Sequence, residues 1–274
     1  MKSSCYINGK IYAINEAAIG VSDLALQRGY AVFDFARTYN GKLFHFNDHI
    51  QRLKNSASEL HLKIPISDKE IRDISGQLII NSTLKQPCIR LILTGGYTYT
   101  RPTLEHPNFI IIAEELPAYS KHIYTKGAKI ITVQYQRELP HIKSINYLNA
   151  LRLEPLKHER QVFDILYYSD NGITECPQNN FFIFKGNTLV TPNDFILHGI
   201  TRKIVLKLAK DHFPIEERPL SLNELEYADE AFATSTTKGI IPIVNIDDQK
   251  IGSGLLGNRT KTLMKIFDNY TKEY

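Results

Sequence analysis

Short alternations of apolar and polar residues open the chain and predict paired β-strands. The first lies in residues 4–14, where apolar residues stand on both sides of Asn8-Gly9. An Asn-Gly pair between two apolar runs is the strongest short-range signal of a β-hairpin. The pattern returns in Ala31–Tyr39 and residues 42–46, which flank Asn40-Gly41. We therefore expect two hairpins within the first 46 residues.

A helical period replaces the alternation after these hairpins. Ile50, Leu53, Ala57 and Leu60 recur every three or four residues, so they fall on one face of a helix, which Asn47 or Asp48 can cap. A second helix is predicted after Ser67, because Ser67 and Glu70 have the spacing of a capping box. Residues 88–94 and 109–114 are β-rich. Residues 1–115 are therefore predicted to form an α+β domain.

The remainder of the chain alternates strands and helices. Residues 116–127 combine Pro117 with polar residues and show no period, which predicts a linker, and residues 128–274 are expected to form the second domain. Strands are predicted at residues 128–136, 164–168, 180–184, 188–191, 230–234 and 240–246. Helices are predicted at residues 144–161, 200–211 and 258–270, with a helical turn at 221–226. The fold class is therefore mixed α/β (α+β) with two domains.

Composition excludes several classes of partner. The 33 basic and 29 acidic residues are mixed along the chain and give a net charge of +4, so neither a basic stripe nor a basic arm predicts nucleic-acid binding. No apolar run approaches membrane-spanning length, and the first 20 residues lack the apolar segment of a signal peptide. Three cysteines, an odd number without paired spacing, are typical of a reducing compartment. A cytoplasmic location is expected.

Two residues between Pro140 and Asn180 raise the question of cofactor chemistry. Lys143 stands before the predicted helix at 144–161, and a lysine amine can bond covalently to a carbonyl cofactor. Glu175 follows an Asn-Gly turn, and a carboxylate is the partner that a protonated pyridine nitrogen needs. Taken alone, each has a common alternative interpretation as a solvated surface charge, and so does Arg52 on the first helix.

Other polar residues predict an anion site rather than a metal site. His45, Asp48 and His49 resemble a metal-binding group only superficially, because His45 is assigned to a strand and His49 to a helix, and no metal is expected. By contrast, the helix that begins near Ile200 and Thr201 would direct unpaired N–H groups toward one point. Ser235, Thr236 and Thr237 add hydroxyl groups before a strand. Two such turns and an arginine favour a bound phosphate.

Five segments occur in the order seen in one family of enzymes. They are LFHFNDHIQRLKNSA, HIKSINYLNAL, NGITECPQNNFF, LHGITRKIV and ATSTTKGIIPI. In these segments the chain resembles the class IV (fold type IV) pyridoxal-phosphate aminotransferases, a group that includes D-amino-acid aminotransferase, branched-chain aminotransferase and aminodeoxychorismate lyase. The HIKS, HGITR and TSTT segments are most similar to the D-amino-acid enzymes, whereas Tyr147 and Arg90 resemble the branched-chain enzymes.

The resemblance implies a fold, a cofactor and roles for individual residues. It implies a smaller N-terminal α+β sandwich and a larger, barrel-like C-terminal α/β domain that binds pyridoxal 5'-phosphate. Lys143 would carry the cofactor covalently and act as the catalytic base, and Glu175 would bind its pyridine nitrogen. Further cofactor contacts are implied for Arg52, Tyr147, Ile200, Thr201, Ser235, Thr236 and Thr237. The family also implies a homodimer.

The substrate side departs from the family pattern. Arg28, Tyr30 and Asp34 stand where relatives carry an aromatic residue, an acid and a glutamate near the substrate, and Phe33, Arg90 and Arg101 are the remaining substrate candidates. The expected reaction moves an amino group between a branched-chain L-amino acid or a D-amino acid and a 2-keto acid. Two alternatives stay open: aminodeoxychorismate lyase activity, which releases pyruvate and 4-aminobenzoate, and cofactor binding without turnover.

Overall fold

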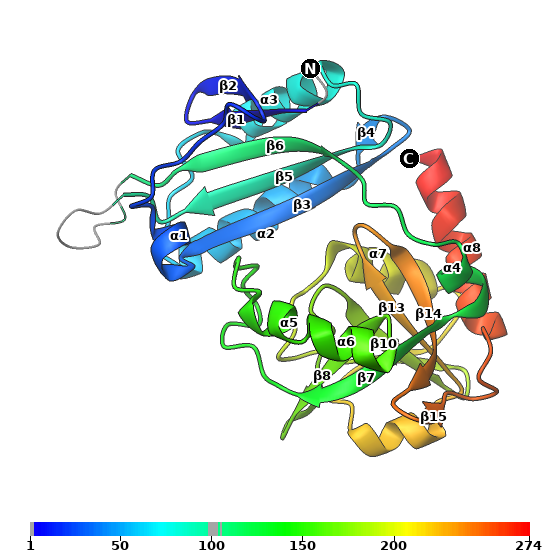
Figure 1. The fold of residues 1–274 in the computed structure, drawn as a ribbon. Coiled ribbons are helices and arrows are strands. Elements are labelled where there is room, and N and C mark those ends of the chain that lie inside the picture. The colour runs from blue at the N-terminus through cyan, green and yellow to red at the C-terminus, as the bar shows by residue number, and fades with distance from the viewer. Residues whose placement is uncertain (1–2, 98–103, 105) are drawn as a thin grey trace. The chain divides into compact units, whose positions relative to one another are not determined.

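The computed structural model describes residues 3–97, 104 and 106–274, and these form two compact units (Figure 1). The first unit comprises the described residues up to Pro117, together with Ile142–Asn146 and Tyr274. The second comprises Ala118–His141 and Tyr147–Glu273. The segment that carries Lys143 thus belongs to the first unit, whereas the sequence analysis placed it in the second domain.

An antiparallel sheet with the strand order β2-β1-β6-β5-β3-β4 forms the centre of the first unit. Its strands are β1 (Ser4–Ile7), β2 (Lys10–Ala13), β3 (Ala31–Tyr39), β4 (Lys42–Leu43), β5 (Pro87–Thr94) and β6 (Phe109–Glu115). Both predicted hairpins are confirmed. At the second turn Asn40 and Gly41 have φ values of 50° and 76°, and positive φ at both central residues is what a tight hairpin turn requires.

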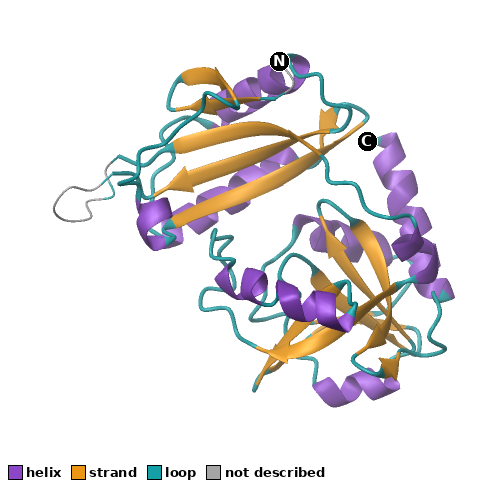
Figure 2. Cartoon of the chain, in the orientation of Figure 1, coloured by secondary structure: helices purple, strands orange, loops and turns teal. Residues whose placement is uncertain are grey.

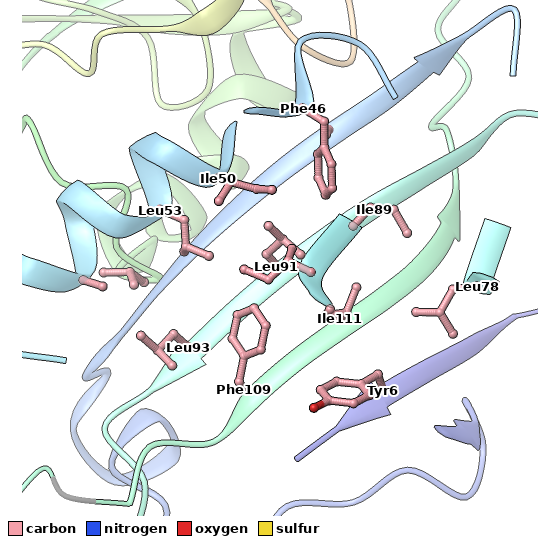
Figure 3. Packing of buried hydrophobic residues seen from close by; sticks show 14 of the residues in the cluster. Tyr6, Phe46, Ile50, Leu53, Leu78, Ile89, Leu91, Leu93, Phe109 and Ile111 are labelled. Atoms are coloured by element: carbon pink, nitrogen blue, oxygen red, sulfur yellow. The ribbon is translucent and has the colours of Figure 1, made fainter. Parts of the chain in front are cut away.

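Two helices, α2 (Phe46–Glu59) and α3 (Asp68–Ile80), cover one face of this sheet and bury its core, and the short helix α1 (Leu24–Arg28) precedes β3 (Figure 2). Figure 3 shows Ile50 and Leu53 of α2 facing Leu91, Leu93 and Phe109 of the sheet. Because side chains alternate across a strand, the residues between these core positions point to the opposite face. That face carries Phe33 and Phe35 of β3 and Arg90 of β5.

The helix starts agree only in part with the sequence analysis. The capping box of Ser67 and Glu70 at α3 is confirmed. The predicted cap of α2 at Asn47 or Asp48 is wrong: the helix already begins at Phe46, after His45 in the left-handed region with φ of 47°, and without a side-chain cap. Strand β4 ends at Leu43 and α2 begins at Phe46, before the polar residues that were expected to cap it.

A mixed sheet with the strand order β12-β11-β10-β13-β14-β7-β8-β9 forms the second unit, and β15 (Gln249–Lys250) pairs with β14. Its strands are β7 (Ala128–Gln134), β8 (Asp164–Ser169), β9 (Gly172–Ile173), β10 (Asn180–Lys185), β11 (Thr188–Thr191), β12 (Ile215–Glu217), β13 (Glu230–Ser235) and β14 (Gly239–Ile246). Ile173 of β9 donates to the Leu220 carbonyl just beyond β12, at 2.7 Å. The two edges of the sheet therefore meet, and the sheet curls into the barrel-like form that was expected.

The helices of the second unit are α4 (His122–Lys126), α5 (Leu148–Arg152), α6 (Glu154–Arg160), α7 (Ile200–Ala209), the 3-10 helix η1 (Leu222–Tyr227) and α8 (Asn258–Glu273). The single helix predicted at residues 144–161 is wrong. Pro155 lies in the first turn of α6, and its ring and missing N–H prevent one helix from continuing through this point. The residues assigned to a linker, 116–127, include α4. None of the helices in the described parts of the chain has the length and apolar character needed to cross a membrane.

Candidate active site

Lys143 lies in an extended segment that the first unit holds by its backbone. Its carbonyl accepts from the Phe33 N–H at 2.9 Å, and its own N–H donates to Ser56 Oγ at 3.1 Å. One residue on, Ser144 forms a bridge with Val32 of β3. The Lys143 Nζ atom lies 4.5 Å from the centre of the Phe33 ring. The predicted position at the head of a helix is therefore wrong, and hydrogen bonds to β3 and α2 position this amine instead.

Arg52 is fixed by a buried acid from the neighbouring strand. Asp34 of β3 is fully buried, and its carboxylate accepts from Arg52 Nε at 2.8 Å and from Arg52 Nη2 at 2.9 Å. The same carboxylate contacts His49 Nδ1 at 2.6 Å. A guanidinium held by two parallel hydrogen bonds has a defined orientation. Asp34 thus points to α2, the helix-covered side of the sheet.

The members of this buried group shift one another's pKa values. Burial by itself would raise the pKa of Asp34, but the Arg52 guanidinium and the His49 imidazole reverse that effect and hold the pKa well below its usual range. Burial lowers the pKa of His49, although Asp34 opposes the shift. The contribution of His49 to this group is its hydrogen bond to Asp34. Within the described ranges no three His, Cys, Asp or Glu side chains gather as metal ligands.

The substrate candidates of the first unit occupy different places. Arg28 is exposed and donates to the Gln27 carbonyl, whereas the Tyr30 hydroxyl donates to the Leu60 carbonyl at 2.7 Å. Arg90 and Phe33 lie together, because Arg90 Cζ is 5.6 Å from the centre of the Phe33 ring. Arg101 lies outside the described residues. Of these candidates, Phe33 and Arg90 are thus the two that the structure brings together with Lys143.

Glu175 is a buried acid of the second unit, with 4% of its surface exposed. Arg137 Nη1 donates to its Oε1 atom at 2.8 Å. The Leu197 N–H and Asn180 Nδ2 donate to its Oε2 atom at 3.0 and 3.3 Å. The alternative interpretation of Glu175 as a surface hairpin residue is therefore wrong. Both carboxylate oxygens are held, so the orientation of the group is fixed, and its donors stabilise negative charge.

The start of α7 lies beside this acid. Asn180 Nδ2 also donates to the Leu197 carbonyl at 2.7 Å, and Gly199 caps α7 without any side-chain hydrogen bond. The first backbone N–H groups of a helix have no partner within it, so those at Ile200 and Thr201 are available to an anion. Both residues are nearly buried, with 6% and 5% exposed.

Two hydroxyl groups lie unpaired on the neighbouring strand. Thr234 of β13 is directly opposite Asn180 of β10 in the ladder, and Ser235 follows it. The Oγ1 atom of Thr234 and the Oγ atom of Ser235 are buried and have no hydrogen-bond partner among the described residues. Leaving a buried hydroxyl unpaired costs about 1–3 kcal/mol, so such groups indicate a ligand or water. Thr236 and Thr237 form the turn that leads into β14.

Sequence reasoning missed three of the residues that organise these groups. Arg137 and Asn180, which hold Glu175, were not candidates. Asp34 was assigned to the substrate side and was not identified as the partner of Arg52. Nothing in the spacing of Arg137 and Glu175 announces an ion pair, because 37 residues and two strands separate them. A usable signal existed at Asp34, since an acid in an otherwise apolar strand needs a buried partner. Tyr147, a further candidate, is half-buried and precedes α5.

Comparison with known proteins settles the family. The family model for Amino-transferase class IV matches residues 31–246. This chain is a class IV aminotransferase. A D-alanine aminotransferase of Listeria monocytogenes is 30% identical over 271 residues, which cover 95% of this chain and 93% of the relative. A putative branched-chain-amino-acid aminotransferase of Methanocaldococcus jannaschii is 33% identical over 274 residues, with 96% and 94% covered. The crystal structure of the Escherichia coli branched-chain amino acid aminotransferase superposes with a TM-score of 0.92 at 26% identity, covering 98% of this chain and 95% of that one.

The class IV assignment confirms the expected activity and cofactor. The enzyme transfers an amino group between an amino acid and a 2-keto acid with pyridoxal phosphate. The residues present fit that cofactor: the buried unpaired hydroxyls and the uncapped start of α7 suit its phosphate, and the buried Glu175 suits its pyridine nitrogen.

Proposed function

We propose that Lys143 is the catalytic residue of this aminotransferase and that Glu175 and Arg52 are its principal cofactor ligands. The observation that carries the proposal is the fixed Glu175 carboxylate, which is buried, held on both oxygens and linked through Asn180 to the start of α7. A buried acid whose two oxygens are both held by hydrogen bonds is a candidate for a functional group.

Each unit contributes a defined set of groups to the proposed chemistry. The first unit contributes the Lys143 amine and the Arg52 guanidinium, which is suited to a phosphate. The second contributes Glu175, and for the phosphate the N–H groups and hydroxyls of Ile200, Thr201, Ser235, Thr236 and Thr237. Tyr147 is proposed to hydrogen-bond the ring hydroxyl of the cofactor. Several phosphate contacts are needed because they keep the cofactor in place whenever its covalent attachment is released.

The proton transfers fall to Lys143. When bound, pyridoxal phosphate supplies the aldehyde carbon that reacts with amines and a ring that withdraws electrons from the substrate's Cα. The Lys143 amine removes the proton from Cα as a general base and holds it for return. Phe33, whose ring lies against Nζ, limits the positions that the amine can adopt. Glu175, stabilised as an anion by Arg137, keeps a proton on the pyridine nitrogen.

The substrate is proposed to be an amino acid with a small or branched apolar side chain. The relatives' names, D-alanine and branched-chain-amino-acid aminotransferase, both specify such a side chain. A homodimer in the cytoplasm is proposed as the working form. Leu148 and Leu151 of α5 support a partner chain, because 76% and 67% of these apolar residues are exposed. The three buried, unpaired cysteines support a reducing compartment.

A spectroscopic half-reaction tests the proposal. Purified enzyme loaded with pyridoxal phosphate is mixed with D- and L-alanine, D- and L-leucine, or aminodeoxychorismate while its visible spectrum and any pyruvate are recorded. Stoichiometric loss of the cofactor band with one enantiomer is expected. The Lys143→Ala variant should lose the wild-type band, and Lys129→Ala, which removes an exposed lysine of β7, should keep it.

Two outcomes would contradict the proposal. If the Lys143→Ala variant retained the wild-type band and the half-reaction, Lys143 would not be the catalytic residue. Pyruvate and 4-aminobenzoate formed from aminodeoxychorismate, without net conversion of the cofactor, would instead indicate the lyase.

A further inference from the structure

Arg202 is a buried arginine in the first turn of α7 that the proposed chemistry does not use. It belongs to the HGITR segment, and 4% of its surface is exposed. Burying a charge is costly unless the charge has partners. Burial lowers the pKa of Arg202, and the carboxylates of Glu217 and Glu175 oppose that shift. The guanidinium is therefore attracted by the acid that is proposed to bind the cofactor's pyridine nitrogen.

Two oxygen atoms hold the Arg202 side chain. Its Nη2 atom donates to the Pro192 carbonyl at 2.8 Å and to Glu217 Oε2 at 2.9 Å. Its Nε atom is buried and has no hydrogen-bond partner among the described residues. Glu217 is the last residue of β12, which pairs in parallel with β11, and Pro192 directly follows β11. The guanidinium thus ties the start of α7 to the ends of two neighbouring strands.

The contact with Pro192 fixes one end of the loop that leads into α7. Glu175 and Asn180 hold the other end, because the Leu197 N–H donates to Glu175 Oε2 at 3.0 Å and the Leu197 carbonyl accepts from Asn180 Nδ2 at 2.7 Å. All of these residues belong to the second unit. The start of α7 therefore has a defined position relative to the Glu175 carboxylate. A cofactor whose phosphate and pyridine nitrogen belong to one small molecule requires such a fixed separation.

Arg202 also adds positive charge where α7 already carries it. The N-terminus of a helix has a partial positive charge, which favours anions and disfavours cations. The first turn of α7 contains Arg202 and no acidic residue, and Gly199 caps it without a side-chain hydrogen bond. The Glu217 side chain is 48% exposed, so solvent weakens its compensation of the guanidinium. An anion at the start of α7 would therefore be attracted by both the helix and Arg202.

We propose that Arg202 is a positioning residue for the cofactor's phosphate. It holds the first N–H groups of α7 in place relative to Glu175 and supplies positive charge beside them. The inference rests on the proposed phosphate contacts of Ile200 and Thr201. It goes further by giving a role to a buried cation that is not among the proposed cofactor ligands.

Binding of two forms of the cofactor tests the role of Arg202. Pyridoxal has the ring and aldehyde of pyridoxal phosphate but no phosphate, so the ratio of its dissociation constant to that of pyridoxal phosphate measures the phosphate preference. Equilibrium dialysis of the cofactor-free protein gives both constants. Arg202→Gln should lower the phosphate preference about tenfold, which corresponds to about 1.4 kcal/mol, and should change the affinity for pyridoxal little. Arg202→Lys, which keeps the charge, should retain most of the preference.

Two matched variants separate the charge of Arg202 from its effect on stability. Arg218→Gln removes a neighbouring arginine that pairs with Glu216 and Glu224, and it should leave the phosphate preference at the wild-type value. Glu217→Gln removes the negative charge beside Arg202 but keeps an oxygen that can accept from Nη2, so the preference should stay unchanged or rise. Thermal unfolding verifies that each variant folds. Arg202→Met replaces Arg202→Gln if the latter does not fold, and Glu217→Gln tests the charge even if neither does.

The proposal fails if Arg202→Gln keeps the wild-type phosphate preference, if it weakens the binding of both compounds alike, or if Glu217→Gln lowers the preference. Failure of the proposed function gives a different result. A wild-type protein that binds pyridoxal as tightly as pyridoxal phosphate would have no phosphate site, and both proposals would fall. A wild-type preference that Thr236→Val reduces and Arg202→Gln does not would count against Arg202 alone.

Discussion

Replacement of Asp34 by asparagine should destabilise the first unit more than any surface substitution. Asparagine has nearly the same size and shape, so the change removes the negative charge and leaves the packing intact. Arg52, whose side chain is 11% exposed, and the buried His49 then remain without their acid. The perturbation therefore isolates the electrostatic role of a single buried carboxylate.

The magnitude follows from the burial of the whole group. Removing one partner of a buried ion pair costs about 3–5 kcal/mol, because the remaining charge stays desolvated and uncompensated. We expect Asp34→Asn to lower the free energy of unfolding by about 3 kcal/mol at pH 7. With a urea m-value of about 3 kcal/mol/M, this moves the unfolding midpoint by about 1 M.

Urea titration of the cofactor-free protein, followed by circular dichroism, measures this change directly. A double-mutant cycle with Arg52→Met then separates the pair from its surroundings. The double variant should lose less stability than the sum of the single variants by about 1.5 kcal/mol or more, because it leaves no isolated charge. Asp73→Asn provides the matched control, since Asp73 pairs with the exposed Lys69 and its loss should not move the midpoint.

The same group predicts how stability depends on pH. The folded-state pKa of His49 lies below its usual value of 6.5, so the unfolded chain binds the proton more readily and stability should fall as the pH drops below about 6.5. The lowered pKa of Asp34 adds a second loss below its unfolded value of 3.8. A loss of less than about 1 kcal/mol in Asp34→Asn, or a pH profile identical to that of wild type, would refute the reasoning.

Three other substitutions or modifications have defined outcomes. Arg137→Met should weaken pyridoxal-phosphate binding about tenfold or more, because it leaves Glu175 with fewer hydrogen-bond donors. Equilibrium dialysis measures this affinity. Arg152→Met, which changes an arginine on the surface of the second unit, should leave the affinity unchanged. Gly199→Ala should also reduce cofactor affinity, since the added Cβ would lie 2.1 Å from Asn180 Oδ1. An affinity equal to that of wild type would show that the loop adapts. The three buried cysteines should not react with a thiol reagent until the protein unfolds. For Cys88, burial also raises the pKa to about 12. Rapid labelling of the native enzyme would contradict this prediction.

Local signals in the sequence were sufficient for elements that depend on neighbouring residues. The Asn-Gly turns, the strand at Ala31–Tyr39 and the capping box of Ser67 and Glu70 each depend on contacts within a few positions. Where a local pattern competed with tertiary pairing, the prediction failed. Residues 144–147 have a helical pattern, yet β3 takes Ser144 and Ile145 as backbone partners, and Pro155 divides the helical stretch after them into α5 and α6.

The sequence by itself determined the family, the cofactor and the identities of the candidate residues, because ordered motifs persist when the surrounding residues change. Only the tertiary structure decided which charges are paired. Arg52 with Asp34, Glu175 with Arg137 and Arg90 with Glu114 are 18, 38 and 24 residues apart. The energy of an ion pair depends on distance and burial, and a linear sequence specifies neither. Those pairings turn three surface-like charges into an anchored guanidinium, a fixed acid and a bidentate ion pair on the first sheet.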